Sequence, residues 1–153
     1  MRLLRFMAEA DTDDDLPSES GAFRTKPRVL VVDDDASMAR RLALALEVVG
    51  VDGHVVSDGD LALKALDEAA REDRPVDLVI VELMLPRMSG LELAREIRAR
   101  FPEVRLVLTG AYHLSERQLT RAGCNAIAFV PKPCEPSVVA AFVREKAVRP
   151  RQR

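Results

Sequence analysis

From Arg28 onward, short apolar runs alternate five times with longer amphipathic stretches. The apolar runs lie at 28–32, 53–56, 77–81, 104–108 and 126–130, and the amphipathic stretches at 36–49, 59–71, 89–100, 114–122 and 136–147. Short, nearly continuous apolar runs are typical of strands buried on both faces, as in a parallel sheet whose connections are helices. The alternation therefore predicts one α/β domain built from five βα units.

The two ends of the chain do not share this pattern. Residues 1–26 include the acidic stretch "EADTDDDLPSESG", which has no apolar periodicity and predicts a disordered leader. The alternative is a segment that folds when it docks on a partner. Residues 148–153 form a short basic tail, so we expect the folded domain to occupy 27–147.

Charge and cysteine content narrow the class of protein. A formal net charge of −2 over 153 residues gives no general attraction to nucleic acid or membranes. No apolar run approaches the roughly 20 residues of a membrane span. Cys124 and Cys134 are the two cysteines, and their spacing matches neither a disulfide framework nor a zinc site. We therefore expect free thiols and a cytoplasmic protein.

Polar side chains follow four of the five predicted strands. Asp33, Asp34 and Asp35 come after the first strand, and Glu82 follows the third. The carboxyl ends of parallel strands meet at one edge of the sheet, where the repulsion of crowded carboxylates is usually offset by a cation or a basic side chain. Magnesium prefers such oxygen ligands, so Asp33, Asp34 and Glu82 predict a magnesium site. The alternative is that the aspartates only cap the next helix.

A lysine and a threonine extend this predicted site. Lys132 follows the fifth strand between Pro131 and Pro133, where its ammonium can hold a phosphoryl oxygen or a carboxylate and where the Lys-Pro bond can be cis. Thr109 follows the fourth strand, and its hydroxyl can bind an anion in the same crevice. Together these groups predict a metal-assisted phosphoryl site.

The order of these motifs resembles the receiver domain of two-component response regulators. The resemblance covers 28–147 and rests on "VLVVDDDASMARRL", "DLVIVELMLPRMSGLEL", "LVLTG" and "FVPKP". It implies a flavodoxin-like, doubly wound parallel sheet with strand order 2-1-3-4-5. It also implies site roles: magnesium ligands Asp33, Asp34 and the Met84 carbonyl, a phosphoryl contact from Lys132, and a switch pair formed by Thr109 and Phe129. The alternative for Phe129 is an ordinary core residue.

One residue departs from the family pattern. Glu82 stands where the family carries the aspartate that accepts a phosphoryl group. The additional methylene moves the carboxylate by about 1.5 Å, and a misplacement of about 1 Å can lower a rate about 100-fold. We therefore expect no ordinary phosphotransfer, and we expect Glu82 to pair with Lys132 instead. Glu82 is interpreted either as a partial mimic of aspartyl phosphate or as a simple loss of phosphorylation.

The predicted function is that of a stand-alone, atypical receiver in a phosphorelay, which is not an enzyme and acts by protein–protein interaction. Its expected partners are signalling proteins, such as a histidine kinase or a downstream effector, with neither nucleic acid nor membrane. The family's usual partner surface corresponds to 114–122, 126–130 and 136–147. The alternative is a magnesium-dependent phosphatase of the haloacid-dehalogenase type, with Asp33 as nucleophile and Asp35 as acid. A flavin-binding electron carrier is set aside, because the aspartates would repel the cofactor phosphate.

Overall fold

The computed structural model describes residues 26–148, in which five strands alternate with five helices. The strands are β1 (Arg28–Val32), β2 (Asp52–Val56), β3 (Leu78–Glu82), β4 (Arg105–Gly110) and β5 (Ala128–Pro131). The helices are α2 (Ala36–Val48), α3 (Gly59–Arg71), α4 (Gly90–Arg100), α5 (Glu116–Arg121) and α6 (Pro136–Ala147). Each predicted element is confirmed, with ends that differ by at most two residues. The predicted acidic leader and basic tail lie almost entirely outside the described residues.

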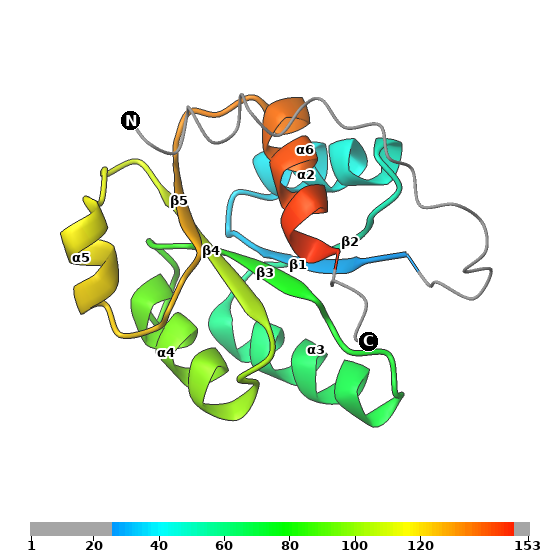
Figure 1. The fold of residues 1–153 in the computed structure, drawn as a ribbon, viewed down its shortest axis with the longest axis horizontal. Helices are drawn as coiled ribbons and strands as arrows, with labels where there is room; N and C mark the ends of the chain where they lie inside the picture. The colour runs from blue at the N-terminus through cyan, green and yellow to red at the C-terminus, as the bar shows by residue number, and fades with distance from the viewer. Residues whose placement is uncertain (1–25, 149–153) are drawn as a thin grey trace.

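All five strands run parallel in the order β2-β1-β3-β4-β5, which confirms the predicted flavodoxin-like topology (Figure 1). From β1 the chain first builds outward to β2 and then crosses back to β3 on the other side. In such a sheet a crevice opens at the carboxyl ends of the two strands where the direction of winding reverses. The topology therefore puts the ends of β1 and β3, with Asp33 and Glu82, side by side.

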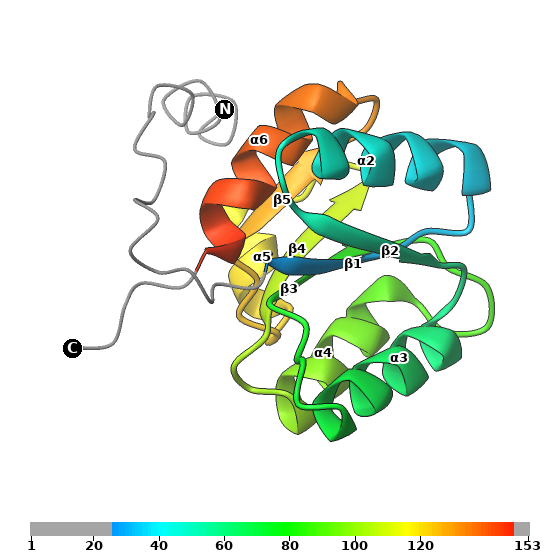
Figure 2. The same ribbon diagram turned by 90° about the vertical axis from the view of Figure 1, so that its right-hand side faces the viewer.

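The helices form a layer on each face of the sheet. Figure 2 shows α2 and α6 on one face and α3 and α4 on the other. Successive strand residues alternate between the two layers: Val29 and Val31 of β1 pack with α2 and α6, whereas Leu30 and Val32 pack with α3 and α4. This double burial explains why the strands read as continuous apolar runs.

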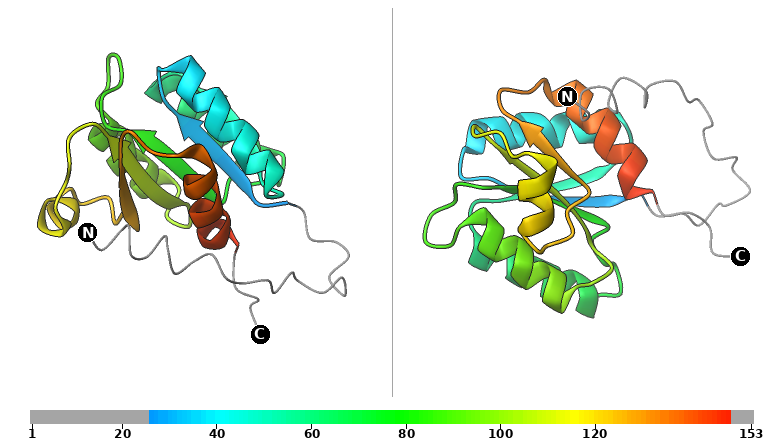
Figure 3. Two further views of the ribbon diagram at one scale, coloured as in Figure 1. Left: turned by 90° about the horizontal axis from the view of Figure 1, so that it is seen from above. Right: turned by 60° about the vertical axis from the view of Figure 1, so that its left-hand side comes forward.

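Helix α5 differs from the other four helices. It lies apart from them, at the β5 side of the sheet (Figures 1 and 3), and none of its residues is buried. A capping box between Ser115 and Gln118 fixes its first turn. Its Leu119 is only partly buried against the core, so α5 buries less apolar surface than the other helices.

Capping side chains mark the first residues of four helices. Four residues accept a hydrogen bond from the backbone N–H three positions later, which satisfies one of the unpaired donors of a first turn: Asp35, Asp58, Ser89 and Ser115. Within residues 26–148, none of the helices combines the length and the apolar character needed to cross a bilayer.

Candidate functional site

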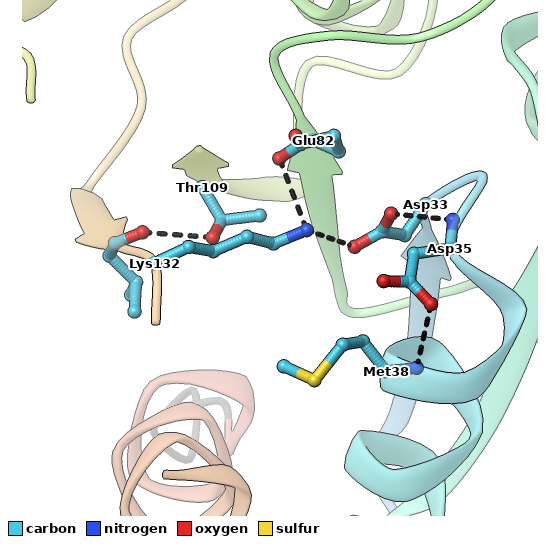
Figure 4. A network of polar contacts seen from close by, with 7 residues as sticks. Asp33, Asp35, Met38, Glu82, Thr109 and Lys132 are labelled. Carbon is cyan, nitrogen blue, oxygen red and sulfur yellow. Dashed lines mark hydrogen bonds and ion pairs between the residues drawn. The ribbon is translucent and has the colours of Figure 1, made fainter. Parts of the chain in front are cut away.

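Four of the predicted site residues meet at the carboxyl ends of four strands, on the side of α2 and α6 (Figure 4). Val31, Ile80, Val107 and Val130 face these helices in β1, β3, β4 and β5. Side chains alternate along a strand, so the residues two positions further on point to the same side. These residues are Asp33, Glu82, Thr109 and Lys132. The period-two pattern therefore explains their convergence.

Lys132 is the centre of this cluster. Its Nζ lies 2.6 Å from Asp33 Oδ2 and 3.5 Å from Glu82 Oε2. Both carboxylates are buried, with side-chain exposures of 6% for Asp33 and 9% for Glu82. The predicted pairing of Glu82 with Lys132 is confirmed, but Asp33 is the closer partner, which the sequence did not indicate. The Lys132–Pro133 bond is cis, as expected.

Burial and neighbouring charges shift the pKa of both Glu82 and Lys132. Removal from water raises the pKa of Glu82; the Lys132 charge acts against this shift, and the Asp33 charge adds to it. Burial by itself would lower the pKa of Lys132, but the hydrogen bond and charge of Asp33, together with the contribution of Glu82, raise that pKa. At 3.5 Å the Glu82 contact is an ion pair at the outer limit of a hydrogen bond, and Oε2 has no hydrogen-bond partner among the described residues.

The three consecutive aspartates differ in what their side chains contact, which decides between the pocket and the capping interpretations. Asp33 is buried, and its Oδ1 accepts a hydrogen bond from the Asp35 N–H at 3.0 Å while Oδ2 faces Lys132. Asp35 caps α2 by accepting from the Met38 N–H at 3.2 Å. Asp34 is exposed. The pocket interpretation thus holds for Asp33 and the capping interpretation for Asp35.

The predicted magnesium site fits these residues in donor type. Asp33 and Glu82 offer hard carboxylate oxygens, and Glu82 Oε2 is buried without a hydrogen bond. Lys132 Nζ lies within reach of both carboxylates, so a divalent ion would compete with the ammonium. Across residues 26–148, no group of three or more His, Cys, Asp or Glu side chains is arranged to hold a metal ion. Magnesium binding by Asp33, Asp34, Glu82 and the Met84 carbonyl stays a prediction.

The two proposed switch residues lie on opposite faces of the sheet. Thr109 Oγ1 donates a buried hydrogen bond of 2.8 Å to the Val130 carbonyl, so this hydroxyl is already used within the protein. Phe129 packs in the core on the side of α3 and α4, with its ring edge-on to His113 at 5.9 Å between centroids. The core interpretation of Phe129 is confirmed, and its role as a switch stays a prediction.

A third buried carboxylate, which the sequence did not indicate as a site residue, lies at the same edge of the sheet. Asp58, after β2, accepts from the Leu61 N–H at 2.9 Å through Oδ1, and its Oδ2 lies 2.7 Å from Nη2 of Arg87. Its signal was the pair Asp58-Gly59 at the start of an amphipathic stretch, as expected for a helix cap. Asp33, Asp58, Glu82 and Thr109 are the buried polar and charged residues of the described chain, and each follows or ends a strand.

Both cysteines have free thiols, as predicted. Cys134 borders a cavity of about 30 Å³ between α2 and α6, which also reaches Asp33, Thr109 and Lys132. Burial raises the pKa of the Cys134 thiol, which disfavours the reactive thiolate. The cavity walls are mainly apolar side chains such as Leu42 and Val139.

Comparisons with known proteins place the chain among signalling proteins. The family model of the response regulator receiver domain matches residues 29–144. The DNA-binding response regulator MtrA of Mycobacterium tuberculosis is 38% identical over 124 residues, which cover 81% of this chain and 52% of MtrA. The transcriptional regulatory protein AruR of Pseudomonas aeruginosa is 36% identical over 110 residues, which cover 72% of this chain and 45% of AruR. The chain thus spans about half the length of these relatives.

Solved structures show the same fold. The receiver domain of NtrX from Brucella abortus superposes with a TM-score of 0.65 at 29% identity, covering 78% of this chain and 96% of that one. A receiver domain protein from Methanospirillum hungatei gives a TM-score of 0.68 at 23% identity, covering 80% and 94% of the two chains. The predicted fold class is therefore supported independently of the motifs.

The relatives contradict one prediction and leave another without support. The prediction that nucleic acid is no partner is wrong, because relatives such as MtrA are DNA-binding response regulators. The prediction relied on the net charge of this chain. That charge carries no information on DNA binding by the parts of MtrA that lie outside the matched region. The phosphatase alternative finds no support, since Asp33 is tied to Lys132 and Asp35 caps α2.

Proposed function

Because this chain belongs to the receiver domains of two-component response regulators, we propose that it acts as an atypical receiver, independent of phosphorylation at the usual position. The resemblance puts Glu82 in the place of the phosphoacceptor aspartate. The observation that carries the proposal is the ion-paired pocket, in which Lys132 lies 2.6 Å from Asp33 and 3.5 Å from Glu82. The lysine that would contact a phosphoryl group is already paired with two carboxylates of the protein.

The charge balance of the pocket supports this proposal. Two carboxylates and one ammonium carry a net charge of about −1 in a site largely removed from water, so an incoming phosphoryl group would add negative charge where no free cation offsets it. Magnesium, when bound, would supply positive charge near Asp33 and Glu82. Transfer to Glu82 would still require its longer side chain to reach the in-line position.

The proposed mode of action is binding to other proteins rather than catalysis. In the family the partner surface corresponds to α5, β5 and α6, and the partners expected here are a histidine kinase or a downstream effector. The named relatives link receivers to DNA binding, so we include DNA as a target of the pathway. Three further points stay predictions: that the domain works without an attached output domain, that it is cytoplasmic, and that it has no enzyme activity.

Two interpretations of Glu82 lead to different partner binding. If its charge partly mimics a phosphoryl group, Glu82→Gln should weaken binding of a captured partner by about 1–3 kcal/mol, the usual size of a coupling free energy. If Glu82 only abolishes phosphorylation, the wild type, Glu82→Gln and Glu82→Ala should bind the captured partner with equal affinity. Both interpretations keep wild-type binding independent of phosphodonor.

Co-purification from the native cell tests the proposal. Wild type and Glu82→Asp would be compared with and without acetyl phosphate, and recovered partners quantified by mass spectrometry. We expect the wild-type set to be insensitive to acetyl phosphate and the Glu82→Asp set to respond. A wild-type interaction that requires the phosphodonor would refute the proposal. Turnover of a chromogenic phosphomonoester with magnesium would instead support an enzyme.

A further inference from the structure

An ion pair outside the predicted site joins two of the loops at the carboxyl edge of the sheet. Arg87 lies in the loop 83–89 between β3 and α4, and Asp58 lies at the start of α3. Their contact, Nη2 to Oδ2, is 2.7 Å. The Asp58 side chain is 11% exposed, whereas that of Arg87 is 70% exposed. Arg87 therefore lies over a buried carboxylate and neutralises it from the solvent side.

The backbone of Arg87 indicates that this contact is held against a conformational cost. Its φ is 68°, in the left-handed region that residues other than glycine rarely adopt. Such conformations persist where surrounding contacts determine them. Asp58 provides such a contact, because one of its oxygens caps α3 and the other binds the Arg87 guanidinium.

A second contact joins the same two segments. A Cβ on Gly59 would lie 2.9 Å from Met88 Sδ, so the Met88 side chain fits directly over this glycine. Asp58 and Gly59 thus contact the adjacent residues Arg87 and Met88. Two independent contacts therefore fix the middle of the loop 83–89 on the start of α3.

The far end of the loop returns to Glu82 itself. The Gly90 N–H donates to the Leu83 carbonyl at 2.8 Å, and a Cβ on Gly90 would lie 2.1 Å from the Glu82 carbonyl oxygen. The residue after the loop, Gly90, is therefore held directly against the backbone of Glu82 and Leu83, where the loop begins. A displacement of its middle would be transmitted to the backbone that follows Glu82, including Met84.

We infer that Asp58 and Arg87 form a clasp that positions the loop 83–89, and with it Glu82 and the Met84 carbonyl, for cation binding in the pocket. The inference rests on the proposed function, because the cation is the magnesium that the family implies. Arg87 is then a positioning residue: it contacts neither the cation nor Lys132, and it acts through the loop.

Three variants separate the clasp from a general effect of losing an arginine. Arg87→Ala removes the ion pair, and Arg87→Lys keeps a cation that can face Asp58. Arg100→Ala is the matched control, because Arg100 Nη2 also lies 2.7 Å from a carboxylate of α3, that of Asp67, but on the outer surface of the helices. Amide hydrogen exchange and magnesium titration followed by NMR would be measured for all three.

We expect Arg87→Ala to speed exchange of the Met88 and Gly90 amides about tenfold and to raise the magnesium dissociation constant about fivefold. Arg87→Lys should recover at least part of both effects, and Arg100→Ala should change neither. Unchanged exchange in Arg87→Ala would refute the clasp. Faster exchange with unchanged magnesium affinity would refute the positioning role.

The outcomes also separate this inference from the proposed function. If wild type shows no magnesium response up to tens of millimolar, the metal part of the proposed function fails. The clasp is then decided by amide exchange and by the Leu83 amide shift, which reports on the backbone beside Glu82. A shift of this amide in Arg87→Ala but not in Arg100→Ala supports the clasp, and no shift refutes it.

Discussion

Replacing Lys132 with methionine should destabilise the domain by leaving two buried carboxylates without their cation. Methionine keeps much of the side-chain length but removes the charge within 2.6 Å of Asp33 and 3.5 Å of Glu82. Removing one partner of a fully buried pair costs about 3–5 kcal/mol. Because the Lys132 side chain is 19% exposed and water can reach the pocket, we expect about 2–3 kcal/mol here.

Urea unfolding followed by circular dichroism would measure this loss. With an m-value of about 1.5–2 kcal/mol per molar, the midpoint should fall by roughly 1–2 M at pH 7. The loss should be smaller near pH 4.5, where protonation removes part of the Glu82 charge, because burial raises the pKa of this carboxyl. Magnesium at about 10 mM should restore part of it if a divalent ion can take the place of the ammonium.

Lys64→Met, on the exposed surface of α3, serves as the control and should shift the midpoint by less than about 0.5 kcal/mol in free energy. A Lys132→Met protein that matches wild type at pH 7 would refute the view that Lys132 stabilises this pocket. A loss of equal size at both pH values would show that packing, rather than charge, is the cause.

Three further changes test single contacts. Burial raises the pKa of Glu82 above its ordinary value of 4.5. The folded state therefore loses stability as the pH rises from about 4.5 through the folded pKa, because the buried carboxyl must then ionise. Glu82→Gln should remove this decline and should match or exceed the wild-type free energy of unfolding at pH 7, measured by urea titration. Thr109→Val loses the buried bond to the Val130 carbonyl and should cost about 1 kcal/mol by thermal unfolding, whereas no change would mean that water replaces it. Gly90→Ala places a Cβ 2.1 Å from the Glu82 carbonyl oxygen and should cost about 3 kcal/mol or more, and near-wild-type stability would contradict the loop geometry.

The sequence predicted the fold and the edge of the sheet at which the site lies, because both follow from short-range patterns. Apolar runs of four or five residues gave the strands, and alternation along them puts Asp33, Glu82 and Lys132 on one side. The preference of Lys132 for Asp33 over Glu82 was not predictable in this way. It depends on the distances from Lys132 Nζ to the two carboxylates, 2.6 and 3.5 Å, whose difference of less than 1 Å no residue pattern encodes.

The clasp and the Thr109 hydrogen bond were missed for a related reason. In the sequence Arg87 has no feature that distinguishes it from other charged loop residues, and its ion-pair partner Asp58 lies 29 positions away. Thr109 was expected to follow a strand and to face an anion, but it lies at the penultimate position of β4 (Arg105–Gly110), where its hydroxyl donates to a carbonyl of the neighbouring strand at 2.8 Å. Long-range polar partners depend on the folded geometry, whereas the Asp35 cap depends on a residue three positions away, and the sequence already indicated it as an alternative.

The central claim is that this pocket is occupied by its own ion pairs and does not accept a phosphoryl group at Glu82. Intact-mass measurement under non-acidic conditions, after incubation with acetyl phosphate and magnesium, tests it most directly on wild type and Glu82→Asp side by side. We expect wild type to stay unmodified, while Glu82→Asp, with a carboxylate about 1.5 Å shorter in reach, gains one phosphoryl group. A stable phosphoryl group mapped to Glu82 in the wild-type protein would contradict the account.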